Sequence, residues 1–217
     1  MVDWLRAFLA ESRPARWGLL AVGALVVLGI LGFGGWTWYQ SQQGQGAVAL
    51  AAAAELAQKA QAPGATAEQR AAAAQALEAV IAQHPRYAGL PEAAYRLGNV
   101  RYDAREYAAA RGAYQIALAK GATGAIKLMA AAGIGYTWEA EKDYAKAQTA
   151  FEAALAGLGP KDFLYEALLL DIARTQEFGG RRDAALETYR RLLKDVPDSR
   201  RADDVRTRIA SLQSASK

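Results

Sequence analysis

Cysteine is absent from this chain of 217 residues, and its absence excludes several classes of protein. Without a thiol there is no disulfide framework, no thiolate metal site, no cysteine nucleophile and no cysteine-linked lipid anchor. Histidine is almost absent too: the one histidine, His84, precedes a proline and has no Ser, Asp or Glu at a triad spacing. We interpret His84 as a turn residue between helices.

Motifs for catalysis and cofactor binding are missing as well. The chain has no pair of histidines, no acidic calcium-loop pattern and no phosphate-binding G-x-x-x-x-G-K sequence. We therefore predict that the protein is not an enzyme, with no catalytic residues, no metal, no cofactor and no small-molecule substrate. An enzyme hypothesis would require an activity that is lost when His84 or an acidic residue of the predicted groove is changed.

Proline is scarce, and neither sign of charge is in strong excess. The sequence has 6 prolines, and its formal net charge of +4 comes from 26 Lys and Arg against 22 Asp and Glu. Few turn residues and many alanines favour helices throughout. The balanced charge differs from the clustered basic charge of a dedicated nucleic-acid binder.

Charged residues are missing altogether from residues 17–39, which are almost entirely apolar. As a helix this run would be about 35 Å long, enough to cross a bilayer. Trp17 begins the run, and Trp36, Trp38 and Tyr39 end it, where amphipathic rings would meet the headgroups. We predict a transmembrane signal-anchor helix over 17–39.

The charges around this run predict its orientation. Arg13 and Arg16 stand just before it, whereas the next basic residue is Lys59. The positive-inside rule then makes residues 1–16 a cytoplasmic leader and places the rest of the chain outside. The alternative is a signal peptide cleaved near Ala47-Val48-Ala49, although its apolar region would normally be about 7 to 15 residues.

Helical signals follow a short linker, residues 40–46. A first helix is expected over 47–60, ended by Pro63-Gly64. Thr66 is the expected N-cap of a second helix, with Gln69 completing a capping box and Pro85 closing the helix. The two helices would form one hairpin.

The same arrangement recurs along the chain. Five residue pairs are 37 residues apart: Gly98 and Gly135, Tyr107 and Tyr144, Ala110 and Ala147, Tyr114 and Phe151, and Ala117 and Ala154. A third copy follows after 38 residues, where Ala185 matches Ala147 and Tyr189 matches Phe151. Such a period predicts stacked helical hairpins, with longer turns at 121–124 and 157–160.

These units resemble the tetratricopeptide repeat, which has a Leu-Gly pair and an aromatic residue on its first helix, then Ala, aromatic, Ala and a terminal Pro on its second. The best match comprises Leu97-Gly98, Tyr102, Tyr107, Ala110, Tyr114 and Ala117, followed by Ile134-Gly135, Tyr144, Ala147, Phe151 and Ala154. The later unit keeps Gly180, Ala185, Tyr189 and Pro197, and the most degenerate one, the first, keeps Ala73, Leu77, Val80 and Pro85.

The resemblance implies an all-α fold. An N-terminal transmembrane helix would precede a tetratricopeptide-type α-solenoid, residues 47–213, of about four hairpins. Residues 200–213 would form its capping helix, with Val205, Ile209 and Leu212 facing inward, and 214–217 would be a tail.

The resemblance also implies a groove lined by the first helices of successive hairpins. The residues that it assigns to a protein- or peptide-binding groove are Tyr95, Asn99, Tyr102, Asp103, Tyr136, Glu139, Arg174 and Glu177. Tyrosines beside mixed polar groups suit an extended peptide. The family's carboxylate clamp is not reproduced, since its basic positions hold Tyr95, Ala167 and Asp171.

Nucleic acid is the competing ligand for the stretch 95–114, because bases stack on tyrosines over basic grooves. The repeat register assigns Tyr107 and Tyr114 to packing, and the predicted topology places the domain outside the cytoplasm. We therefore expect proteins as partners and no nucleic acid.

The whole plan resembles the YfgM-like ancillary subunit of the bacterial Sec translocon. This resemblance implies a single-pass protein of the bacterial inner membrane, with a periplasmic repeat domain. It would act as a scaffold or chaperone-like factor, with translocon components, periplasmic folding factors or exported polypeptides as partners. The alternative is an envelope-assembly or cell-division adaptor, whose terminal repeats the segment KDVPDSRRADDV resembles.

Overall fold

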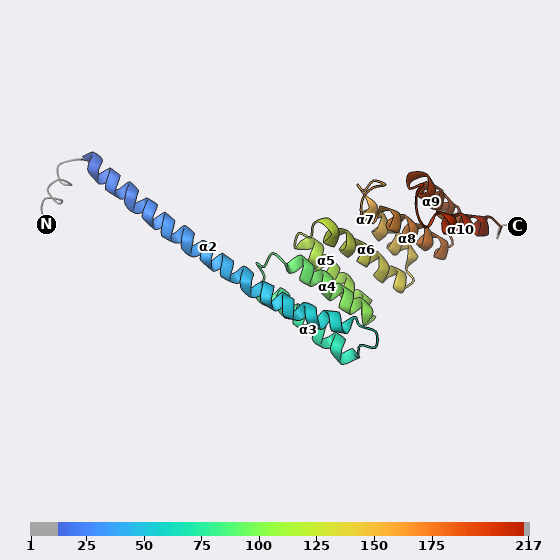
Figure 1. Ribbon diagram of the computed structural model, residues 1–217, viewed down its shortest axis with the longest axis horizontal. Helices are drawn as coiled ribbons and strands as arrows, with labels where there is room; N and C mark the ends of the chain where they lie inside the picture. Colours follow the sequence, from blue (N-terminus) through green and yellow to red (C-terminus); the bar gives the residue numbers. More distant parts are fainter. Residues whose placement is uncertain (1–12, 215–217) are drawn as a thin grey trace. The chain divides into compact units, whose positions relative to one another are not determined.

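The computed structural model describes residues 13–214, which form nine α-helices and no strand. The chain divides into two compact units, the first ending at Gln45 and the second beginning at Gly46. Figure 1 labels the helices, and their bounds are α2 Arg13–Ala60, α3 Ala67–Gln83, α4 Leu90–Asp103, α5 Tyr107–Ala119, α6 Gly124–Ala140, α7 Tyr144–Leu155, α8 Tyr165–Phe178, α9 Arg182–Asp195 and α10 Ala202–Ser214.

The first unit contains the apolar part of α2. Its large apolar side chains are exposed, and Trp17 at 74 % and Phe33 at 67 % are examples. From Leu20 onward the helix has a stretch of mean hydropathy 2.0 with none of it buried, so its length and composition suffice to cross a membrane. The leader predicted over 1–16 lies mostly outside the described residues.

The expected helix start at Ala47 is wrong, because α2 continues without a break from Arg13 to Ala60. The linker predicted over 40–46 is helical and lies inside α2. No proline occurs between Pro14 and Pro63, and a glycine such as Gly44 costs an interior helix position only about 1 kcal/mol. Glycines alone therefore do not stop this helix.

The predicted capping box at the start of α3 is confirmed. The backbone N–H of Gln69 donates to Thr66 Oγ1 at 3.2 Å, and the backbone N–H of Thr66 donates to Gln69 Oε1 at 2.8 Å. His84 is the C-cap of the same helix, and its backbone N–H donates to the carbonyl of Val80. The interpretation of His84 as a turn residue is thus confirmed.

Helices of the second unit pack as successive antiparallel pairs, with α4 on α5, α6 on α7 and α8 on α9 (Figure 1). The repeated glycines explain the close packing within a pair. A Cβ atom at Gly98 would lie 2.4 Å from the Tyr114 ring, and one at Gly135 would lie 2.4 Å from the Phe151 ring. The 37-residue period therefore repeats a glycine-on-aromatic contact.

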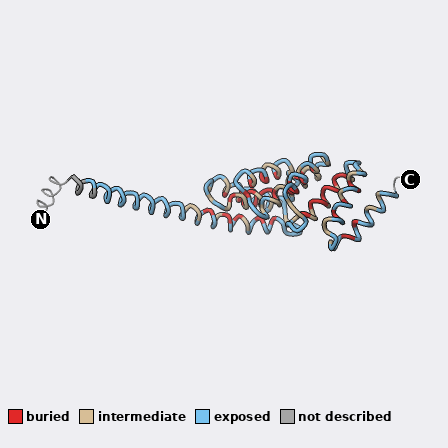
Figure 2. Tube along the Cα trace, turned by 90° about the horizontal axis from the view of Figure 1, so that it is seen from above, coloured by how far each residue is buried: buried red, intermediate tan, exposed pale blue. Residues whose placement is uncertain are grey.

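Alanines and aromatics of the repeat belong to the buried core of the second unit, together with leucines such as Leu77 and Leu168. Figure 2 shows where along the chain the buried residues lie. Ala110, Ala147 and Phe151 are fully buried. Val205 of α10 is buried, and Ile209 and Leu212 pack partly against the same apolar cluster, which confirms the predicted inward face of the terminal helix. The all-α stack of four hairpins and a capping helix is therefore the observed fold.

Two connections between hairpins are longer than a tight turn. Gly121 has φ of 86° between α5 and α6, and Gly157 has φ of 82° after α7, a left-handed conformation that favours glycine. The second connection extends beyond the predicted turn at 157–160, because α8 begins only at Tyr165. Leu164, with φ of 67°, is the last residue of this connection.

Candidate functional site

Four of the predicted groove residues surround one pocket on the first helices of neighbouring hairpins. The pocket has a volume of about 260 Å³ and lies between α4 and α6. Its lining comprises Tyr95, Asn99, Tyr102, Tyr114, Met129, Ala132, Gly133, Tyr136 and Leu164. We call it the tyrosine pocket. The structure therefore brings together Tyr95, Asn99, Tyr102 and Tyr136.

Hydrogen bonds and ring contacts hold the walls of the tyrosine pocket. The Tyr114 hydroxyl donates to Asn99 Oδ1 at 2.8 Å, and the Tyr95 hydroxyl donates to the Met129 sulfur at 3.5 Å. The ring centroids of Tyr95 and Tyr114 are 6.0 Å apart. Burial raises the pKa of Tyr102 and of Tyr114 above the ordinary value of 10.0, because it disfavours the charged phenolate.

The repeat register assigns Tyr114 only to packing, yet its ring also forms part of the pocket wall. A second glycine makes this possible, because a Cβ atom at Gly133 would lie 2.7 Å from the Tyr114 ring. The ring therefore lies between Gly98 of its own hairpin and Gly133 of the next. The glycine pair Gly133 and Gly135 in the sequence was the available signal for this contact.

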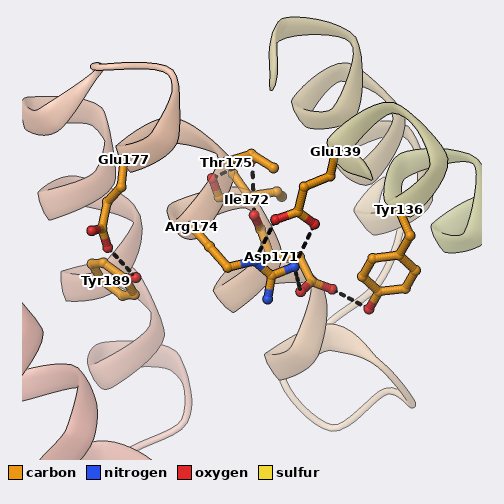
Figure 3. Close-up of polar contacts among 8 residues, drawn as sticks. All are labelled: Tyr136, Glu139, Asp171, Ile172, Arg174, Thr175, Glu177 and Tyr189. Carbon is orange, nitrogen blue, oxygen red and sulfur yellow. Dashed lines mark hydrogen bonds and ion pairs between the residues drawn. The ribbon is translucent and has the colours of Figure 1, made fainter. Parts of the chain in front are cut away.

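A network of polar side chains joins α6 to α8 beside the tyrosine pocket (Figure 3). The Tyr136 hydroxyl donates to Asp171 Oδ2 at 2.6 Å. Arg174 donates to both carboxylate oxygens of Glu139, each at 2.7 Å, and it lies 2.8 Å from Asp171 Oδ1. Glu139 and Arg174 are therefore engaged with each other.

The electrostatics of this network follow from burial. Asp171 is buried, and desolvation raises its pKa despite the opposing hydrogen bond from Tyr136 and the charge of Arg174. Burial and the bond to Asp171 raise the pKa of Tyr136, and the hydrogen bond to Glu139 raises the pKa of Arg174. Sequence reasoning treated Asp171 only as a departure from the clamp, and missed it as the partner of Tyr136.

Glu177 is also engaged, in a second network that joins α8 to α9 and α10. The Tyr189 hydroxyl donates to Glu177 Oε1 at 2.6 Å, as Figure 3 shows, and Arg208 Nε donates to the same oxygen at 3.0 Å. The Glu177 side chain is only 6 % exposed. The contacts of Glu139, Arg174 and Glu177 thus connect neighbouring helices of the stack.

Asp103 lies apart from the tyrosine pocket. It lines a separate pocket of about 270 Å³ between α3 and α4, together with Arg70 and Arg101. Burial raises the pKa of Asp103, and the charge of Arg70 opposes that shift. The structure therefore does not bring Asp103 together with Tyr95, Asn99 and Tyr102.

The site is composed mainly of aromatic and small side chains. Among the residues that the structure describes, no group of three or more His, Cys, Asp or Glu is placed to hold a metal ion. The tyrosine pocket offers ring faces, the Met129 sulfur and hydroxyl groups. In ligand sites generally, apolar walls with a few polar groups hold an apolar group and fix its orientation.

Comparison with known proteins shows that residues 139–209 match the model of the tetratricopeptide repeat family. The matched segment begins near the end of α6 and extends into α10, so it includes α7, α8 and α9. This finding supports a tetratricopeptide repeat protein. The stack of hairpins in the second unit is a tetratricopeptide-type solenoid.

A solved structure that is similar to the chain is that of a thermophilic tetratricopeptide repeat protein of Thermus thermophilus. The two share 19 % sequence identity, and the match covers 81 % of this chain and 98 % of that one with a TM-score of 0.33. So low a score adds nothing to what the helix packing shows. No curated protein matches the chain.

Proposed function

We propose that this tetratricopeptide repeat protein is a membrane-anchored binding module for other polypeptides, with the tyrosine pocket as its recognition site. The observation that carries the proposal is the convergence of Tyr95, Tyr102 and Tyr136 on one partly open pocket. Tetratricopeptide domains generally bind proteins, and aromatic rings supply large contact area at low entropic cost.

The chemistry of the pocket favours a large apolar side chain of an extended peptide. Its walls are rings and the Met129 thioether, and its volume of about 260 Å³ suits one such side chain. Asn99 and the tyrosine hydroxyls supply hydrogen-bonding groups for the backbone of the bound peptide. The ligand is a polypeptide that exposes apolar residues, as an unfolded or newly exported chain does.

The exposed apolar stretch of α2 supports the anchor. Aromatic residues mark both of its ends, with Trp17 at one and Trp38 and Tyr39 at the other. Arginines precede it and no basic residue follows before Lys59, which favours a cytoplasmic N-terminus and a periplasmic repeat domain in a bacterial inner membrane. This arrangement fits an accessory factor of the Sec translocon that receives exported chains or holds folding factors.

A photo-crosslinking experiment in intact bacterial cells tests the proposal. A photoreactive amino acid at Tyr102 should form adducts with exported polypeptides, translocon subunits or periplasmic folding factors, identified by mass spectrometry. The matched control is the exposed residue Gln115 of α5, which lies outside the pocket. Absence of adducts at Tyr102, or equal adducts at both positions, contradicts the proposal. Adducts confined to cell-division or outer-membrane assembly proteins would favour the envelope-adaptor alternative.

A further inference from the structure

Helix α6 presents two different surfaces. Met129, Gly133 and Tyr136 line the tyrosine pocket, whereas Lys127, Ala131, Ile134 and Trp138 line a second cavity. At about 100° per residue the two sets lie on opposite sides of the helix. The second cavity is therefore separate from the proposed recognition site.

This second cavity, which we call the α6–α7 groove, is the more apolar of the two surfaces. It has a volume of about 520 Å³, and its apolar lining is Leu118, Ala131, Ile134, Trp138, Ala150 and Ala153. Three of these are alanines, so the backbones of α6 and α7 lie close to whatever occupies the groove. No carboxylate is part of the lining.

The charge along this part of the chain is of one sign. Between Glu106 and Glu139 the sequence contains Arg111, Lys120 and Lys127 and no acid. Lys127 forms no ion pair with any residue in 13–214 and is exposed at the rim of the groove.

Two cations contact the ring of Trp138, at another part of the groove. The guanidinium of Arg111 lies 3.6 Å from the centroid of the Trp138 ring, and the ammonium of Lys146 lies 4.4 Å from it. Each has one acidic partner outside the groove lining: Arg111 pairs with Glu141 at 2.7 Å, and Lys146 pairs with Asp143 at 2.6 Å. With both acids included, this end is electrically balanced. Of the four charged groups, Lys146 lines the groove, whereas Arg111, Glu141 and Asp143 are not part of its lining.

The two cationic positions lie at opposite ends of the groove. Lys127 is in the first turn of α6, and Trp138 with Lys146 marks the place where α6 ends and α7 begins. About eleven residues of helix separate Lys127 from Trp138, a rise of about 16 Å. A ligand helix of about three turns would match this length, with one acid at each end and apolar side chains between them.

We propose that the α6–α7 groove is a second docking site, which binds an acidic amphipathic helix of a partner protein. Close packing on the alanine floor suits a helix, because a helix satisfies its own backbone hydrogen bonds. An apolar stripe would cover Ile134 and Trp138, and carboxylates at the two ends would meet Lys127 and Lys146. The protein would then hold two polypeptides at once, one on each side of α6.

A labelled full-length chain in phosphatidylcholine nanodiscs tests the second site. Because the chain has no cysteine, Thr149→Cys at the edge of the groove accepts a single environment-sensitive fluorophore. The probe is a synthetic amphipathic helix with a leucine stripe and one glutamate at each end, three turns apart. Saturable binding is expected, with affinity lowered at least about tenfold by Lys127→Glu, which replaces a charge attraction to the peptide by a repulsion.

Charge exchange provides the decisive control. A peptide with lysines in place of the glutamates should bind Lys127→Glu better than the unchanged protein. Ala150→Glu should reduce binding of the acidic peptide by placing a carboxylate on the groove floor, and circular dichroism checks that this variant keeps its helices. Tyr102→Ala, which removes a ring from the tyrosine pocket, should leave this affinity unchanged.

Three results would overturn the second site. The first is that the acidic peptide shows no saturable binding. The second is that neither Lys127→Glu nor Ala150→Glu changes its affinity. The third is that Tyr102→Ala abolishes its binding. Binding to phosphatidylglycerol vesicles without binding of the peptide would identify a lipid-facing surface and also overturn it. Crosslinking at Tyr102 is a separate readout, so failure of the tyrosine pocket and failure of this groove are distinguishable.

Discussion

Single residues determine how closely the helices of a hairpin approach each other. Gly98 and Gly135 are each in contact with an aromatic ring of the second helix, and the Phe151 ring beneath Gly135 is fully buried. A buried ring cannot move without disturbing its neighbours, because protein interiors are packed as densely as organic crystals. The glycine is therefore required by the ring opposite it.

Gly135→Ala should destabilise the protein by about 1–3 kcal/mol, because the new Cβ atom overlaps the Phe151 ring. The matched control is Gly112→Ala in α5, where a Cβ atom meets nothing within 4 Å. That variant should gain up to about 1 kcal/mol from helix propensity. Urea denaturation of both variants measures the difference, and equal stabilities would contradict the packing argument.

Asp171 should make stability depend on pH. Burial raises its pKa above the ordinary value of 3.8, so between 3.8 and the raised pKa the folded state binds more protons than the unfolded state. The stability that Asp171 contributes to the folded state is thus fully present below pH 3.8, and it is lost as the pH rises through the raised pKa. Asp171→Asn removes this titration and keeps an oxygen that accepts from Tyr136.

The unfolding free energies of the unchanged protein and of Asp171→Asn should be compared from about pH 3.5 to 7. This range begins just below 3.8, the ordinary pKa of an aspartate side chain. The unchanged protein should lose stability relative to the variant as the pH rises. Other carboxyl groups titrate equally in both proteins, so they cancel in the difference, apart from Glu139, which shares the network. If the difference between the two unfolding free energies is constant over this range, Asp171 has the same pKa in the folded and unfolded states, and the prediction is wrong.

At the scale of elements, side-chain caps mark where two helices of the second unit, α3 and α7, begin. The capping box of Thr66 and Gln69 starts α3, and Asp143 caps α7 by accepting from the backbone N–H of Lys146 at 3.1 Å. Such caps satisfy backbone donors that have no partner inside the helix. They act within one turn and can be found in the sequence.

Thr66→Ala should cost about 1 kcal/mol, because the threonine hydroxyl accepts one of the two reciprocal bonds of the capping box. Thr149→Ala is the control, since its hydroxyl only donates to the carbonyl of Ala145 within α7. Removal of that hydroxyl should leave stability unchanged or raise it slightly. Thermal unfolding followed by circular dichroism measures both changes, and a larger loss at Thr149 would argue against the capping account.

The whole molecule combines an exposed apolar helix with a solenoid whose core is closed by α10. An isolated hairpin cannot bury both of its faces, so stability in such arrays comes from contacts between neighbours. Arg208 of α10 reaches Glu177 of α8, and Val205 completes the apolar cluster. The terminal helix thus covers the last repeat through an apolar contact and a polar contact.

Topology is testable because the chain has no cysteine. In intact bacterial cells with a permeable outer membrane, Gln115→Cys should react with a membrane-impermeant maleimide, whereas Ser12→Cys should react only after lysis. The mass of the purified protein separates the two anchor hypotheses, because a cleaved chain would begin near Leu50. Labelling of Ser12→Cys in intact cells, or a mature chain that starts near Leu50, would contradict the retained anchor.

The repeats were predictable from the sequence because their signals are local and periodic. The Gly98 and Gly135 spacing, the alanines and the aromatic residues each describe one hairpin, and copies of them give the stack. The break expected at Ala47 was wrong, since a pair of glycines without proline does not end a helix. The tyrosine pocket was only half predictable, because Met129, Leu164 and the Tyr114 ring belong to it as well.

Sequence alone determined the helical class, the charge-free run and the register of the hairpins, because helix formation and apolar periodicity depend on residues within a few turns. Only the tertiary structure decided which polar groups of the first helices are engaged. Tyr136 reaches Asp171 and Glu139 reaches Arg174 across 35 residues of chain. Such partners depend on the rotation between successive hairpins, which no local pattern specifies.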